Sequence, residues 1–271
     1  MGNIGLTGST GSLGKTILKN YHKISFSKFK SDIRDKTALS EWIEKNKLDT
    51  IIHLAAIVPI KKVNNNKKKA REVNFLGTKN LVDICVAKKI KWFFFASTSH
   101  VYSSSKRKIL ESDKLLPISY YGKTKLLAEK YLIRKFKKNK INYCIGRIFS
   151  TTNNNQKRNY LVPDLKHKIK KVKKIKIKLE NLNHFRDFIS MDDLSKIIMF
   201  FLKKKITGIF NLGSGFKIHL KEIANLIAKE YNKEIIFKDN KKPTYLIANI
   251  KKIKMIYKFN ISTDIKKKIF N

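Results

Sequence analysis

The chain has little cysteine and no long apolar run, and each shortage excludes a class of protein. Cys85 and Cys144 are its only cysteines; they lie far apart, each in an apolar stretch. We expect both to be buried free thiols in a reducing compartment, and no cysteine–histidine cluster has metal-ligand spacing. The longest apolar runs, such as residues 197–202, are too short to cross a bilayer, and no signal-peptide pattern is present. We therefore expect a cytoplasmic protein without a metal site or a membrane span.

Acidic residues are also scarce. The 271 residues include 20 aspartates and glutamates against 61 lysines and arginines, a formal net charge of +41, and only seven of the basic residues are arginine. A nucleic-acid reader more often uses arginine, which makes bidentate contacts with bases. The excess of lysine therefore indicates a drift in codon composition, which distributes lysine over the whole solvent-exposed surface. Nucleic acid is expected to bind only non-specifically, and an anionic substrate would be attracted.

Glycine is sparse as well, yet three of the eleven glycines fall together in TGSTGSLG, between an expected strand (residues 3–6) and an expected helix (12–21). Glycines at this spacing allow a tight turn, close approach of the backbone to a pyrophosphate, and close packing of helix on strand. The pattern predicts a dinucleotide site. Its residues are Gly8, Ser9, Thr10, Gly11, Ser12, Leu13 and Gly14.

Further apolar strands alternate with helices of ten residues or more. Strands are expected at residues 50–56, 91–97 and 142–149, helices at 36–47, 70–88 and 122–138, and a solvated loop at 58–69. Such alternation predicts an α/β fold with a doubly wound parallel Rossmann sheet. After a polar hinge at 153–155 the pattern changes. We expect a nucleotide-binding domain of residues 1–150 and a smaller C-terminal substrate-binding lobe of residues 151–271, with some chain crossing back to the sheet.

The chemistry centres on three residues. Thr98 ends an apolar strand, Tyr121 opens a helix, and Lys125 follows one helical turn later on the same face. A nearby ammonium favours the phenolate and makes Tyr121 a candidate acid/base for a carbonyl/alcohol pair. The Tyr-x-x-x-Lys spacing alone is weak evidence, because it also occurs at residues 102–106 and 131–135 in this lysine-rich chain. The upstream glycine loop and Thr98 distinguish the middle pair.

Taken together, these motifs resemble the extended short-chain dehydrogenase/reductase family, the NAD-dependent epimerase/dehydratase group that acts on nucleotide sugars. The matching segments follow the family's order along nearly the whole chain: TGSTGSLG, SDIRD, IIHLAA, VNFLGTKNL, ASTSHVY, SYYGKTK, RIF, RDFISMDDL and NLGSG. The resemblance implies a nucleotide-diphosphate sugar as substrate, NAD or NADP as cofactor, and a possible homodimer.

The resemblance also assigns roles to single residues. Those expected beside the cofactor adenine are Asp32 and Ile33, and those on the nicotinamide side are Leu54, Ala55, Ala56 and Asn74. Lys125 would hold the nicotinamide ribose, while Thr98 and Tyr121 would act on the substrate oxygen. Arg186 would contact the substrate diphosphate. His100, also expected near the substrate, is a further acid/base candidate by its ordinary pKa, although a loop histidine more often only packs.

Two departures from the family pattern narrow the chemistry. Ser99 and His100 follow Thr98 where dehydratases carry an acidic residue, so dehydration is not expected. No carboxylate ends the second strand, which leaves NAD and NADP both open. The expected reaction is hydride transfer at C4 of a nucleotide sugar, with a 4-ketosugar reductase favoured over a 4-epimerase. The alternatives are a non-catalytic nucleotide-sensing or polyanion-binding member, and an oxidoreductase that acts on a non-sugar carbonyl.

Overall fold

The computed structural model describes residues 2–58, 60–153, 156, 158 and 160–258. Its contacts divide the chain into two compact units. Unit 1 comprises residues 1–103, 114–148 and 191–210, and unit 2 comprises 104–113, 149–190 and 211–271. The passage between them at 148–149 lies beside the expected boundary at residue 150. A single boundary at residue 150 would place residues 104–113 in the N-terminal domain and residues 191–210 in the C-terminal lobe. The contacts instead assign residues 104–113 to unit 2 and residues 191–210 to unit 1.

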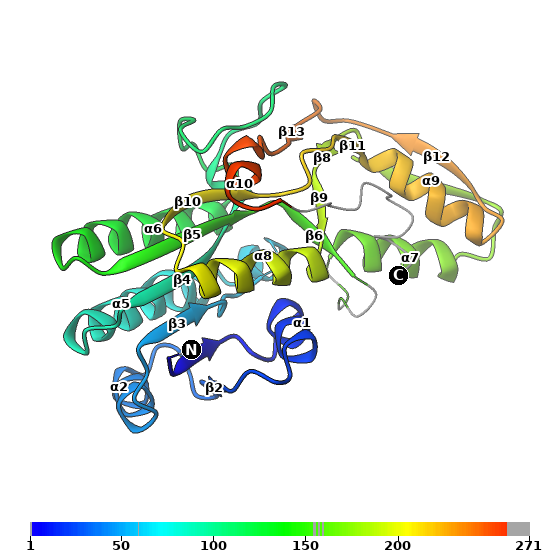
Figure 1. The fold of residues 1–271 in the computed structure, drawn as a ribbon. Coiled ribbons are helices and arrows are strands. Elements are labelled where there is room, and N and C mark those ends of the chain that lie inside the picture. The colour runs from blue at the N-terminus through cyan, green and yellow to red at the C-terminus, as the bar shows by residue number, and fades with distance from the viewer. Residues whose placement is uncertain (1, 59, 154–155, 157, 159, 259–271) are drawn as a thin grey trace. The chain divides into compact units, whose positions relative to one another are not determined.

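Unit 1 is built around a six-stranded sheet in the order β10-β5-β4-β3-β1-β2, as Figure 1 shows. The strands are β1 (Ile4–Thr7), β2 (Phe26–Lys28), β3 (Thr50–His53), β4 (Trp92–Thr98), β5 (Asn142–Ile148) and β10 (Gly208–Leu212). The pairs β2–β1, β1–β3, β3–β4 and β4–β5 are all parallel. The chain leaves β1 toward one edge and returns at β3 toward the other. The strand order therefore reverses between β1 and β3, where ligands bind in open sheets of this kind.

Helices cover both faces of this sheet, because alternate residues of its strands point to opposite sides. The helices of unit 1 are α1 (Ser12–Asn20), α2 (Lys36–Lys45), α3 (Ile60–Asn65), α4 (Lys67–Arg71), α5 (Thr78–Ala87), α6 (Tyr120–Lys138) and α8 (Met191–Lys204). Phe93 and Phe95 of β4 join a core with α2, α5 and α6. Trp92 faces the other side, where its indole nitrogen donates to the Ile206 carbonyl beyond α8. The predicted doubly wound parallel fold is confirmed.

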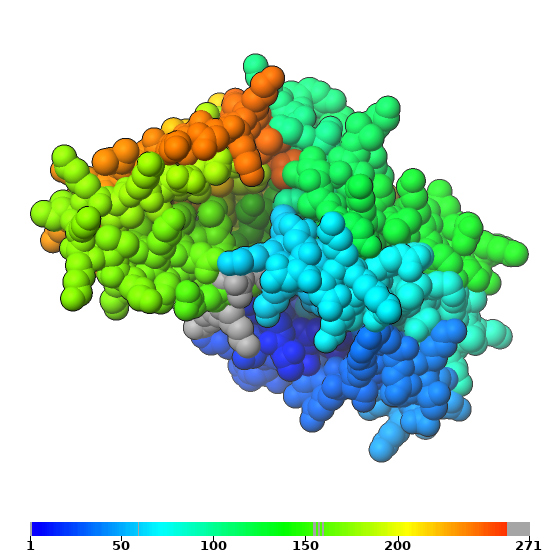
Figure 2. Space-filling view, turned by 180° about the vertical axis from the view of Figure 1, so that it is seen from behind, coloured from blue at the N-terminus to red at the C-terminus, as the bar shows by residue number. Residues whose placement is uncertain are grey.

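The expected loop at residues 58–69 is wrong: α3 and α4 form there and contact α6. Val63 of α3 and Ala70 of α4 are fully buried, whereas the lysines around them are exposed. In this polar, low-complexity sequence, two apolar positions are too few to indicate the buried faces of α3 and α4. This basic segment, cyan in Figure 2, forms part of the surface of unit 1.

The helix expected at 70–88 is present but is not uniform. It begins within α4, passes through a π-helical stretch (Glu72–Gly77), and continues as α5. A π-helical turn widens the backbone and often lies at a functional site. The predicted catalytic tyrosine lies where expected, as the second residue of α6.

The described part of unit 2 contains three small sheets and three helices. Its elements are β6 (Ser150–Thr152), α7 (Leu161–Lys171), β7 (Lys176–Glu180), β8 (Phe185–Arg186), β9 (Phe188–Ser190), β11 (Ile218–His219), α9 (Leu220–Glu230), β12 (Glu234–Lys238), β13 (Tyr245–Leu246) and α10 (Lys251–Ile256). Helices α7 and α9 share an apolar core with β7 and β11. Residues 154 and 155 of the expected hinge lie outside the described residues.

Within the described ranges, no helix combines the length and the apolar character that a bilayer crossing requires.

Candidate active site

The glycine-rich loop at the carboxyl end of β1 packs directly on the loop after β3. Gly8 has φ +73°, a conformation that favours glycine. A Cβ atom on Gly8 would lie 2.6 Å from the backbone nitrogen of Ala55, and one on Gly14 would lie 2.4 Å from the Gly8 carbonyl oxygen. Both positions therefore require glycine. The loop is held at the point where the strand order reverses.

Helix α1 begins at this loop, and no side chain caps the amide groups of its first turn. Its N-cap, Gly11, has no side chain to cap it, and the first turn holds no acidic residue. The amide groups at a helix start carry partial positive charge and bind anions. This backbone cradle fits the pyrophosphate of a dinucleotide cofactor.

The two residues expected beside the adenine are engaged with the protein. Asp32 receives hydrogen bonds from the Arg34 guanidinium, at 2.6 Å from Nη2 to Oδ2, and from the Arg34 amide, at 2.9 Å. The Arg34 hydrogen bonds hold the pKa of Asp32 below its usual value. Arg34 also binds Glu72 at 2.8 Å. Ile33 is buried, and a Cβ on Gly77 would meet its side chain at 2.6 Å. The adenine contacts stay a prediction.

A chain of buried hydrogen bonds joins β1, β3 and the start of α5. His53 Nδ1 lies 2.6 Å from the Thr7 hydroxyl, and His53 Nε2 lies 2.9 Å from the Thr78 hydroxyl. Thr78 donates its own proton to the Asn74 carbonyl, so it must accept from Nε2–H. Thr7 then donates to Nδ1 and accepts from the Ala55 amide. The ring is therefore the neutral Nε2–H tautomer, and burial holds the pKa of His53 well below its usual value.

Asn74, in the π-helical stretch, ties the loop after β3 to the start of α6. Its Oδ1 accepts from the Ile57 amide at 2.7 Å, and its Nδ2 donates to the Ile57 carbonyl and to the Thr124 hydroxyl. Thr124 in turn donates to the Tyr121 carbonyl. Asn74 is fully buried. It therefore connects the residues expected near nicotinamide, 54–56, with the turn that carries Tyr121.

The structure brings the turn after β4 against the first turn of α6. Thr98 ends β4 and caps a short 3₁₀ turn (Ser99–Val101), where its hydroxyl accepts from the His100 amide at 3.2 Å. A Cβ on Gly122 would lie only 2.1 Å from the His100 carbonyl oxygen. The His100 ring centre lies 6.2 Å from that of Tyr121. Thr98, His100 and Tyr121 thus belong to two segments in direct contact.

Lys125 lies one turn beyond Tyr121 and is almost completely buried, with 1% exposed. Its ammonium sits 4.0 Å from the centre of the Phe95 ring, a cation–π contact. Burial lowers the pKa of Lys125 to about 7, and the negative charge of Glu129 opposes that change. Burial therefore disfavours the charged form of Lys125 and brings its pKa close to neutral pH.

Arg186, expected to contact the substrate diphosphate, lies in unit 2 within β8. Its Nη1 donates to the carbonyls of Phe185 and Thr244 at 2.8 and 3.0 Å, and its Nη2 donates to the Thr244 hydroxyl. Burial lowers its pKa to about 10. The next residue, Asp187, accepts from the amides of Ser214, Gly215 and Ala248. The Arg186 guanidinium is thus held in place by hydrogen bonds to Phe185 and Thr244. Its contact with a diphosphate stays a prediction.

Several residues that shape this site were not predicted from the sequence. His53, Gly122 and Glu129 lie inside the motifs HLAA and SYYGKTKLLAE, but their roles depend on tertiary contacts. The four-residue spacing from Lys125 to Glu129 is the one signal that was available.

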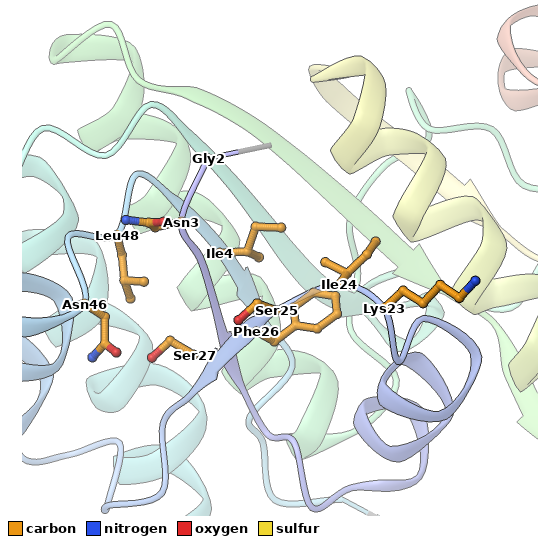
Figure 3. Close-up of a pocket in the computed structure, with 10 residues that line it drawn as sticks. All are labelled: Gly2, Asn3, Ile4, Lys23, Ile24, Ser25, Phe26, Ser27, Asn46 and Leu48. Atoms are coloured by element: carbon orange, nitrogen blue, oxygen red, sulfur yellow. The ribbon is translucent and has the colours of Figure 1, made fainter.

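A separate pocket lies at the other end of the central strands. Figure 3 shows the residues that line it, among them Gly2 and Ile4 near the start of β1 and Phe26 in β2. The candidate catalytic residues lie beyond the opposite, carboxyl ends of the strands. This pocket is therefore not part of the candidate site.

Comparison with known proteins places the chain among nucleotide-sugar enzymes. The model of the GDP-mannose 4,6 dehydratase family matches residues 7–268. The chain is 30% identical to the ADP-L-glycero-D-manno-heptose-6-epimerase of Brachyspira hyodysenteriae, over 92% of this chain and 84% of that protein. It is also 30% identical to the GDP-6-deoxy-D-talose 4-dehydrogenase of Aggregatibacter actinomycetemcomitans, over 87% and 82%.

Two solved structures share the fold at 18% sequence identity. The UDP-glucose 4-epimerase of Thermus thermophilus, in complex with NAD, superposes with a TM-score of 0.87 over 98% of this chain and 96% of that one. RMD from Pseudomonas aeruginosa, complexed with NADPH, does so with a TM-score of 0.87 over 99% and 96%. The match of the family model to residues 7–268, together with the 30% identical relatives, shows that the chain belongs to the GDP-mannose 4,6-dehydratase family, within the extended short-chain dehydrogenase/reductase enzymes.

Proposed function

We propose that this protein is an NAD(P)-dependent enzyme that moves a hydride at C4 of a nucleotide-diphosphate sugar, with reduction of a 4-keto sugar favoured over 4-epimerisation. The observation that carries the proposal is the close approach of Gly122 to His100. It brings the turn after Thr98 and the helix turn with Tyr121 and Lys125 together. A protein that had lost the chemistry would not need to keep this arrangement.

The backbone of residues 8–14 would hold the cofactor pyrophosphate at the start of α1, and Lys125 would hold the nicotinamide ribose. When bound, the nicotinamide supplies a hydride to the substrate carbonyl carbon or takes one from the alcohol. The preference between NAD and NADP depends on the segment after β2, where no carboxylate ends the strand and Asp32, four residues beyond it, is already paired with Arg34.

The proton is moved by the protein. In reduction, the Tyr121 hydroxyl donates its proton to the carbonyl oxygen as the carbon gains a hydride, and in oxidation the phenolate takes that proton back. The Thr98 hydroxyl donates a hydrogen bond to the same oxygen. The Lys125 ammonium favours the phenolate and so makes the proton easier to release.

One feature of this chain supports reduction or epimerisation over dehydration. Dehydration needs a base that removes a proton beside the keto group, and Ser99 and His100 occupy the segment where an acidic residue would supply it. The named relatives include a GDP-6-deoxy-D-talose 4-dehydrogenase and a dTDP-4-dehydro-6-deoxyglucose reductase, the latter from Escherichia coli. Epimerases and a dTDP-D-glucose 4,6-dehydratase stand among the relatives too, so the favoured reductase rests on the residues of this chain.

The test is to purify the protein, dialyse it extensively, and identify any retained nucleotide by its near-ultraviolet absorbance and mass. A nicotinamide cofactor that stays bound favours the epimerase, which recycles it in place. A cofactor-free protein that consumes added NADH or NADPH only with a nucleotide 4-keto sugar is the result expected for the reductase. Failure to bind either cofactor would overturn both.

A further inference from the structure

A buried ion pair joins helix α6 to strand β5, next to the end of β4. The side chains of Glu129 on α6 and Arg147 on β5 are only 1% and 2% exposed. Arg147 Nη2 lies 2.8 Å from Glu129 Oε2, and Arg147 Nε lies 3.2 Å from the same oxygen. The cost of burying two charges can exceed their attraction, and apolar replacements are often equally stable. Stability alone therefore does not account for the pair.

The pair holds the chain on both sides of the turn after β4. Before the turn, the Ser97 hydroxyl donates to the Glu129 carboxylate. After the turn, Arg147 Nη1 donates to the Tyr102 hydroxyl at 2.8 Å, and the guanidinium carbon lies 5.0 Å from the centre of the Tyr102 ring. Ser97 and Tyr102 are both buried. The acid thus binds one end of the turn and the base binds the other, and the ion pair connects the two ends.

The turn between these two ends carries Thr98. Ser97 directly precedes Thr98 on β4. The Tyr102 amide donates to the Ser99 carbonyl at 3.1 Å and so closes the 3₁₀ turn that Thr98 caps. A misplacement of about 1 Å at a reacting group can cost about 100-fold in rate. The aim of the Thr98 hydroxyl is therefore sensitive to any movement of the two ends of the turn.

We propose that Glu129 and Arg147 are positioning residues for Thr98. Their ion pair connects Ser97 to Tyr102 and thereby holds the turn that aims the Thr98 hydroxyl at the substrate oxygen. The role of that hydroxyl in the reaction rests on the proposed function. The ordering of the turn does not, and it can be measured in the protein alone.

The first test is amide hydrogen exchange in the protein without cofactor or sugar. Tyr102→Phe keeps the buried ring and removes only the hydroxyl that accepts from Arg147. The amides of His100 and Tyr102, or of the phenylalanine at 102 in the variant, are expected to exchange about tenfold faster or more, because a hydrogen bond to a charged group is lost. The amides of β1 and β3 should keep the parent's rates. Unchanged exchange in the turn, or an equal rise in β1 and β3, would overturn the proposal.

Tyr131 on α6 provides the matched control, because its hydroxyl also bonds a charged side chain, the carboxylate of Asp83. Tyr131→Phe should leave exchange in the turn after β4 unchanged, and an equal rise there would overturn the proposal. If Tyr102→Phe folds poorly, Ser97→Ala removes the hydroxyl at the other end of the turn. The same local increase in exchange is expected for Ser97→Ala, and its absence would overturn the proposal.

The second test is a double-mutant cycle with Thr98, measured as NADH or NADPH consumption with a nucleotide 4-keto sugar. Tyr102→Phe is expected to lower kcat about three- to tenfold and to leave cofactor affinity unchanged. In a Thr98→Val background, which lacks the hydroxyl, Tyr102→Phe should cause no further loss. A loss of the same size in both backgrounds would overturn the proposal. If the parent turns over no sugar while exchange in the turn responds as expected, the proposed function alone is contradicted.

Discussion

A Cβ atom on Gly122 would lie 2.1 Å from the backbone oxygen of His100, and 2.7 Å from its carbonyl carbon. Only glycine allows the first turn of α6 to lie this close to the turn after β4. Because both contacts are with backbone, no side chain can rotate to make room. The placement of Tyr121 relative to Thr98 depends on this contact.

Gly122→Ala is therefore expected to separate the two segments. We predict a loss of activity of more than about tenfold and a loss of stability of about 1–3 kcal/mol, as for other overpacked sites. Enzyme assays and urea unfolding measure the two effects. Lys123→Ala, at the exposed neighbouring position, is the control and should change neither. Full activity in Gly122→Ala would show that the contact does not position Tyr121.

Two glycines of the glycine-rich loop, Gly11 and Gly14, give a second prediction, on cofactor binding. Gly14→Ala places a Cβ 2.4 Å from the Gly8 carbonyl oxygen, whereas at Gly11 the nearest atom would be 3.3 Å away. Gly14→Ala is expected to weaken NAD(P) binding at least about tenfold by displacing the loop. Gly11→Ala should have a clearly smaller effect. Titration calorimetry measures both, and equal losses would contradict the assignment.

Buried Lys125 is expected to cost the unliganded protein stability. Its pKa is lowered to about 7 by burial, so between that pH and its usual value the unfolded chain binds the proton more tightly. Stability then rises as pH increases through this window, and the full cost remains below pH 7. Lys125→Met should be more stable than the parent by about 3 kcal/mol at neutral pH, and the gap should close at high pH. Urea unfolding across pH measures it; a constant gap would contradict a buried charge at this position.

His53 should behave differently, because its neutral ring satisfies two hydroxyl groups. His53→Phe leaves Thr7 and Thr78 each with one partner fewer, at an expected cost of about 1–3 kcal/mol. The pKa of His53 is lowered by burial, so the unfolded chain takes up a proton that the folded ring does not. The parent should lose stability as pH falls below about 6.5, and His53→Phe should lack that component. Parallel pH dependences of the free energy of unfolding would disprove the neutral tautomer.

The basic segment 60–71 is expected to guide an anionic substrate to the site, because Lys67 Nζ lies 5.8 Å from the centre of the Tyr120 ring, next to Tyr121 in the chain. Replacing Lys67, Lys68 and Lys69 with glutamine should lower kcat/KM about three- to tenfold at low salt, and less at high salt. The matched control replaces Lys137, Lys138 and Lys140, which are exposed at the far end of α6, roughly 24 Å along the helix from Tyr121. Equal losses from the two sets would show a general charge effect.

The features that could be predicted from the sequence are those with local signals. Alternating strands and helices indicated the parallel sheet, and Gly8, Gly11 and Gly14 indicated the cradle at α1. Helices α3 and α4 were missed because only Val63 and Ala70 mark their buried face. The hydrogen-bond chain of His53 and the ion pair of Glu129 and Arg147 join residues 18 to 46 positions apart. Contacts at such separations leave no periodic pattern in one sequence.

The central claim, that Tyr121 moves the proton during hydride transfer at C4, is tested most directly by turnover. The measurement is consumption of NADH or NADPH by the parent and by Tyr121→Phe, with a nucleotide 4-keto sugar as substrate. We predict turnover by the parent, a loss of about 100-fold or more in kcat for Tyr121→Phe, and unchanged cofactor affinity. Tyr121→Phe that reduces the sugar at the parent's rate would contradict the claim.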